Sequence, residues 1–176
     1  MRRELKLIVW LLLGICFSLV CCASNKAGTD LVNYVNQGIL GIADLERVSL
    51  ENYAAVTGKN YTTDQRVYEA LKDQVIPIYK RFLDGLRDIN PQDEAVKRLH
   101  GIYIKGAELL YSGFKMKMLG IEKNDKNLII MSNEKIEKGR IENERWRKEL
   151  DTLCQQQGVA EEKKVKEYQE KKNKEK

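Results

Sequence analysis

The chain contains a single histidine, His100, and this limits the chemistry that it can carry out. A Ser-His-Asp triad could use only this residue, and no Gly-x-Ser-x-Gly turn is present to expose a nucleophilic serine. A di-iron site in a helical protein needs a glutamate three residues before its histidine, whereas Lys97 occupies that position. The sequence therefore predicts no catalytic residues, no metal site and no cofactor. We expect His100 to lie at a core boundary or in a hydrogen bond.

The charged residues are patterned for a solvated surface. Glu142 and Glu144 lie beside Arg140, Arg145 and Arg147, which is typical of exposed ion pairs and not of a paired general acid and base. Across the chain, 31 basic and 26 acidic residues are interleaved, for a net charge of +5. A nucleic-acid binder would gather its basic residues on one face, so we expect no nucleic-acid partner.

The first 22 residues have the pattern of an export signal. A basic start, Met1–Lys6, precedes an apolar run of 14 residues from Leu7 to Val20. The run ends at Leu19-Val20-Cys21-Cys22, which resembles the bacterial lipobox. In that motif a leucine lies three residues before the lipidated cysteine and a small residue directly before it. Leu19 fits when Cys22 is the acceptor, although Cys21 stands where Gly, Ala or Ser is usual.

The resemblance covers residues 1–22 and implies a bacterial lipoprotein. It implies that residues 1–21 are a signal peptide and that acylation of Cys22, with palmitate or a similar chain, anchors the protein to a membrane. The expected location is the cell envelope, facing the periplasm or the exterior. The residues after the acceptor lack the Asp that retains lipoproteins in the inner membrane of enteric bacteria, which favours the outer membrane. The alternative is an uncleaved single-span anchor, for which 14 apolar residues are short.

The rest of the chain predicts an all-α protein. Only two prolines occur, and Glu, Lys, Leu and Ile are abundant, which favours long helices. Four segments of similar length with short connections indicate an up-down-up-down four-helix bundle over residues 30–158. A tether, 22–29, precedes the bundle, and a Lys- and Glu-rich tail, 159–176, follows it as a helical extension or a disordered segment. The helices are expected at about 30–57, 63–89, 90–121 and 127–157.

Apolar residues recur along one face of each segment. In the second and third segments they follow steps of 4, 4 and 3, which favours an antiparallel pair of nearly straight helices. Pro77 should kink the second helix without ending it. Asn90-Pro91 is expected to start the third helix, and Gly120 is a candidate cap near its end. The two apolar faces consist of Val67, Leu71, Val75, Ile78, Phe82, Leu86 and Ile89, and of Leu99, Tyr103, Ala107, Leu110, Phe114, Met118 and Ile121.

The fourth segment has the least continuous apolar face. Ser132, Gly139 and Asn143 interrupt it, so we expect this helix to be the least securely buried. Near the end of this helix lies the motif Arg145-Trp146-Arg147. It can place Trp146 in the core with both arginines outside, or all three residues can form an exposed recognition patch. Cys154, the one cysteine left after lipidation, is expected to be a small buried apolar residue.

Two functional hypotheses follow. The first is a non-catalytic lipoprotein that acts as a structural or protein-interaction bundle, with an envelope protein bound at the fourth helix and the charged tail. The alternative is a carrier of a small or lipid-like ligand, with a pocket between the helices near Tyr103, Phe114 and Met118. An exposed apolar strip on the fourth helix would favour the first hypothesis, and a cavity lined by those three residues would favour the second.

Overall fold

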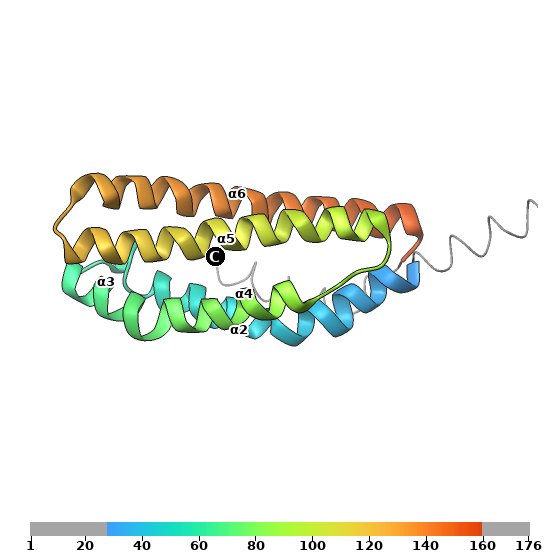
Figure 1. Cartoon of the computed structure of the whole chain (residues 1–176), viewed down its shortest axis with the longest axis horizontal. Helices are drawn as coiled ribbons and strands as arrows, with labels where there is room; N and C mark the ends of the chain where they lie inside the picture. The colour runs from blue at the N-terminus through green and yellow to red at the C-terminus, as the bar shows by residue number, and fades with distance from the viewer. Residues whose placement is uncertain (1–27, 160–176) are drawn as a thin grey trace, which may run out of the picture.

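The computed structural model describes residues 28–159, which are helical with short connections and contain no strand. Long helices lie side by side along the long axis of the molecule in a bundle-like arrangement (Figure 1). The all-α class predicted from the sequence is therefore confirmed. No helix among these residues is long and apolar enough to cross a membrane.

The first helical segment contains a π turn that the sequence pattern did not reveal. Residues 28–33 are helical and lead into η1 (Tyr34–Ile39), a π-helix, and then α2 (Leu40–Ala54). A π turn widens the helix, so the next core position comes five residues after the last one, from Tyr34 to Ile39. Regular steps of three and four along this segment therefore describe its buried face only in part: Leu31, Ser49 and Val56 are buried. Val35 and Leu45 are only partly buried, whereas Tyr34 and Glu46 face the core.

The second segment follows η2 (Gly58–Asn60) and runs through Pro77 without ending, as predicted. It consists of α3 (Asp64–Ala70), the π-helix η3 (Leu71–Val75) and α4 (Ile76–Asp88). The proline has no backbone N–H to donate to the preceding turn, and the π turn lies directly before it. Near this point the Ser49 hydroxyl donates to the Val75 carbonyl oxygen at 2.9 Å, which joins the first two segments.

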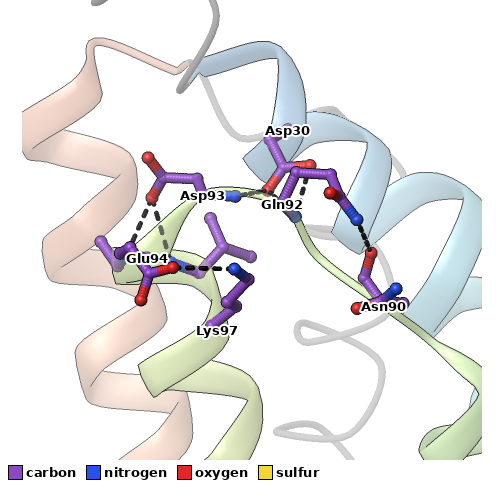
Figure 2. Close-up of polar contacts among 8 residues, drawn as sticks. Asp30, Asn90, Gln92, Asp93, Glu94 and Lys97 are labelled. Atoms are coloured by element: carbon purple, nitrogen blue, oxygen red, sulfur yellow. Dashed lines mark hydrogen bonds and ion pairs between the residues drawn. The ribbon is translucent and has the colours of Figure 1, made fainter.

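The third segment, α5 (Glu94–Glu122), begins three residues later than Pro91. Its N-cap is Asp93, whose carboxylate accepts from the backbone N–H groups of Ala95 and Val96 at 2.9 and 3.2 Å. Asp30 of the first segment accepts in turn from the N–H groups of Gln92 and Asp93, at 3.0 and 2.8 Å, as Figure 2 shows. This tertiary contact fixes the connection and explains why the local Asn-Pro signal did not set the start.

The fourth segment, α6 (Lys126–Gln157), ends at Gly158 as predicted, with φ at 63°. It lies beside α5 along the length of both helices (Figure 1). A Cβ atom at Gly139 would lie 2.8 Å from the Gly106 carbonyl oxygen, so the two backbones touch. Ser132 and Asn143 are buried in the same face. The three residues that interrupt the apolar face in the sequence are thus buried on the inner face of the helix, and Gly139 lies in the contact with α5.

Gly120 also has a different role from the predicted cap. α5 continues to Glu122, and a Cβ atom at Gly120 would lie 3.0 Å from the Ile129 backbone nitrogen of α6. The glycine is therefore a point of close approach between the two helices. The two ends of the described part of the chain also lie close together, since a Cβ atom at Gly28 would lie 3.6 Å from the Val159 side chain. The predicted signal peptide, the predicted lipidation site Cys22 and the residues after 159 lie outside the described residues.

Candidate functional site

A core polar cluster joins the first segment to α5 and α6. It consists of Tyr34, Glu46, His100, Tyr103, Asn143 and Trp146, all buried. Glu46 of α2 accepts a hydrogen bond from the Tyr103 hydroxyl of α5 at 2.8 Å and another from the Asn143 side chain of α6 at 3.0 Å. One carboxylate therefore holds groups from two other helices, and burial followed by the charge of Glu46 raises the pKa of Tyr103.

The second half of the core polar cluster is centred on the Tyr34 hydroxyl. The Trp146 indole N–H donates to it at 3.1 Å, and Nδ1 of His100 lies 3.4 Å away. The Trp146 ring also stacks on Tyr103, with 4.1 Å between ring centroids. Burial lowers the pKa of His100, which favours the neutral imidazole. His100 was expected at a boundary or in a hydrogen bond, and it lies in the core within reach of Tyr34.

A third contact between helices lies nearer the other end of α5. The Lys117 ammonium donates to the Tyr53 hydroxyl of α2 at 2.8 Å and to the Asn133 side chain of α6 at 2.7 Å. Burial raises the pKa of Tyr53 to about 12 and lowers that of Lys117. Burial of Lys117 and Tyr53 is tolerated because they are hydrogen-bonded to each other across helices.

These buried groups contact neighbouring helices and have little access to solvent. Only 7% of Glu46 and 6% of His100 is exposed, and each is covered by neighbouring helices. Within residues 28–159, no group of three or more His, Cys, Asp or Glu residues is arranged to hold a metal ion. In this conformation, the polar cluster can fix the relative positions of the helices but offers no open site for a reaction.

The three residues of the predicted ligand pocket occupy different environments. Tyr103 and Phe114 are buried, and Met118 is half-buried. The Phe114 ring packs against those of Tyr53 and Tyr79, with centroids 4.9 and 5.4 Å away, while Tyr103 stacks on Trp146. Aromatic rings therefore fill the space next to Tyr103 and Phe114, where the ligand hypothesis needs a cavity.

Surface cavities occur elsewhere among the described residues. One, of about 220 Å³, lies between α5 and α6 and is lined by Arg98 and Glu149 among others. Another, of about 360 Å³, lies between the first two segments and is lined by Arg66 and Asp73 among others. Neither includes Tyr103, Phe114 or Met118 in its lining.

The structure separates the three residues of the predicted recognition patch. Trp146 is 7% exposed and belongs to the core polar cluster, so it is not presented to a partner. Arg145 is exposed and pairs with Glu149 at 2.7 Å, and Arg147 is half-buried. The arrangement matches the first of the two sequence interpretations, with Trp146 inside and the arginines outside.

The outward face of α6 carries exposed apolar side chains that the sequence pattern did not single out. Ile130 is 56% exposed, Met131 is 53% exposed and Ile141 is 58% exposed. Ile130 and Ile141 are eleven residues apart, which places them on one line along the helix, and Arg145 follows one turn after Ile141. The sequence does contain a signal for their exposure, because both isoleucines fall outside the heptad positions that form the buried face.

Searches against protein-family models, curated proteins and solved structures found no match for this chain. The function is therefore inferred from the geometry described above.

Proposed function

We propose that the protein is a bacterial envelope lipoprotein, anchored through an acyl group on Cys22, whose helical domain acts by binding protein and not by catalysis. In this proposal the four segments form an up-down-up-down bundle, and the anchored protein faces the periplasm or the exterior, with the outer membrane favoured. The contact surface is the outward face of α6, defined by Ile130, Met131, Ile141 and Arg145.

The observation that carries the proposal is the exposure of Ile130 and Ile141 on one line of α6. Each isolated apolar side chain is ordinary on a protein surface. Here, however, large apolar residues recur on the outside of a helix whose inner face is already packed against α5. Burial of an isoleucine side chain contributes about 1.5–3 kcal/mol, so a partner that covered both would gain appreciable binding energy.

The rigidity of α6 supports the same role. Close contact with α5 at Gly139 and the hydrogen bonds of Asn143 and Trp146 fix the helix from its inner side. A surface on a rigid helix loses little conformational entropy when it binds. The interior hydrogen bonds therefore support the outer face as a preformed contact surface.

The experiment is affinity isolation of the full-length protein from its native envelope after chemical cross-linking. We expect a cross-linked species with the wild-type chain and its loss with Ile130→Asp and Ile141→Asp together. Arg81→Asp is the matched control, because Arg81 is also exposed in a helix interior, on α4. Equal recovery from all three proteins would contradict the role of α6.

A Cys22→Ala variant tests the anchor separately. We expect it to leave the membrane fraction while the folded domain still shows the helical circular dichroism of the wild type. Membrane retention of this variant without an acyl group would contradict lipid anchoring and favour an uncleaved span.

A further inference from the structure

The outermost residues of α6 form a line whose charges change sign at its centre. With 100° per residue, the positions opposite the buried face are spaced at steps of three and four. All of these positions are exposed. This outer line consists of Asn127, Ile130, Glu134, Glu137, Ile141, Arg145, Lys148, Thr152 and Gln155.

The outer line is complementary to itself when it is reversed about Ile141. Glu137 lies four residues before Ile141 and Arg145 four residues after it. Glu134 and Lys148 lie seven residues before and after. The outer positions also match in character, because Asn127 corresponds to Gln155 and Ile130 to Thr152, which carries a methyl group. A second α6 running antiparallel would therefore meet an acid with a base at two positions on each side of the centre.

We propose that the occupant of this face is a second copy of the chain, bound through antiparallel α6 helices across a two-fold axis at Ile141. This inference rests on the proposed function and names the partner of its contact surface. A two-fold contact uses one patch on both subunits, so the patch must be self-complementary, and the outer line meets that requirement. Ile141 then packs on its own copy, and the four interchain ion pairs fix the direction and register.

Ion pairs within α6 do not prevent this contact. Arg145 pairs with Glu149 at 2.7 Å and with the mostly covered Glu142 at 3.7 Å, and Glu137 pairs with Arg140 at 3.8 Å. The side chains of Arg145, Glu137 and Arg140 are each more than half exposed. Exposed pairs of this kind contribute about 0–1 kcal/mol, so the same charges can be shared with a partner helix. The charges thus select orientation and register, while Ile141 and Ile130 supply the apolar contact.

The membrane anchor strengthens a contact of this size. One pair of helices with few apolar residues gives a weak dimer in dilute solution. Anchoring two copies to one membrane raises their effective concentration. The contact is therefore expected on the membrane-bound full-length chain, and that is the form to test.

The first test is disulfide formation in native membranes. The background is Cys154→Ser, which removes the thiol of the helical domain, and the reporter is Ile141→Cys, whose thiols would face each other across the axis. We expect a dimer band on mild oxidation with Ile141→Cys. Little or none is expected in the background alone or with Arg81→Cys on α4. Equal dimer yields at positions 141 and 81 would overturn the proposal, and the melting curves of both variants check that they remain folded.

The second test measures register by exchanging charges around the reporter. Glu134→Lys places like charges opposite each other at two symmetric positions, so we expect the dimer yield to fall about ten-fold. Lys148→Glu alone should act in the same way. The two substitutions together restore opposite charges and should recover the yield to within about two-fold of the reporter chain. Failure of the double variant to recover would overturn the antiparallel register.

Different results would contradict the dimer and the contact role of the α6 face. If Ile141→Cys forms no dimer but cross-links to a different envelope protein that the Ile130→Asp and Ile141→Asp chain does not bind, the second copy is wrong and the proposed function stands. If no contact of either kind depends on the face of α6, both are wrong.

Discussion

The Tyr103 hydroxyl donates a hydrogen bond of 2.8 Å to the carboxylate of Glu46, a residue 57 positions earlier in the chain. Both residues are buried, so the bond forms where water does not compete for either partner. It connects α2 to α5, and Asn143 extends the connection to α6 at 3.0 Å. One carboxylate thus links three helices.

Tyr103→Phe should destabilise the fold because it removes one donor from this buried carboxylate. The expected loss in the free energy of unfolding is about 1–3 kcal/mol, the usual cost of leaving a buried polar group unsatisfied. Urea denaturation followed by circular dichroism measures it. Tyr111→Phe on the half-exposed side of α5 is the control and should change stability by less than about 0.5 kcal/mol. Equal losses of stability in the two variants would mean that the hydrogen bond from Tyr103 to Glu46 does not stabilise the fold.

Replacing glycine by alanine should have opposite effects on stability at Gly139 and at Gly101. A Cβ atom at Gly139 would lie 2.8 Å from the Gly106 carbonyl oxygen and 2.9 Å from the Leu110 backbone nitrogen, so Gly139→Ala must push α5 and α6 apart. We expect a loss of about 1–3 kcal/mol from this overpacking. Gly101 has nothing within 4 Å of the same position, so Gly101→Ala should stabilise α5 by up to about 1 kcal/mol. Thermal melts of the two variants separate packing from helix propensity, and a stabilised Gly139→Ala protein would refute the close contact.

Because His100 is buried, we expect the free energy of unfolding to decrease on acidification. Burial lowers its pKa, so below about pH 6.5, the usual value for an exposed histidine, the unfolded state binds the proton more tightly than the folded state. Stability is then complete above that pH and falls as the pH decreases toward the folded pKa. His100→Gln should flatten the dependence of the unfolding free energy between pH 7.5 and 5.5. An unchanged slope in that variant would assign the effect to other groups.

Much of the fold was predictable because local signals and periodicity agreed. The apolar positions Leu99, Tyr103, Leu110 and Phe114 follow helical spacing and are buried, and Gly158 ends α6 where predicted. The π turns were not predictable from the same rule, since a five-residue step such as Tyr34 to Ile39 breaks the spacing on which the rule depends. Tertiary contact moved other boundaries, as Asp30 does at the start of α5.

The close pairing of α5 and α6 had a sequence signal that was interpreted in the wrong sense. Gly106, Gly113 and Gly120 are seven residues apart on α5, and Ser132 and Gly139 are seven apart on α6. Small residues on one face allow backbones to touch, whereas their low hydropathy suggested weak burial. Single hydrogen bonds such as Tyr103 to Glu46 cannot be deduced from periodicity, because the acid occurs outside the apolar pattern.

Photo-cross-linking at position 141 tests whether the outward face of α6 is the contact surface. A photoreactive phenylalanine analogue is placed at position 141 of the full-length chain in its native cells, and at position 81 on α4 as the control. We expect illumination to yield a defined cross-linked species from position 141 and none from position 81. No species from position 141, or the same species from both positions, would contradict the proposed contact surface.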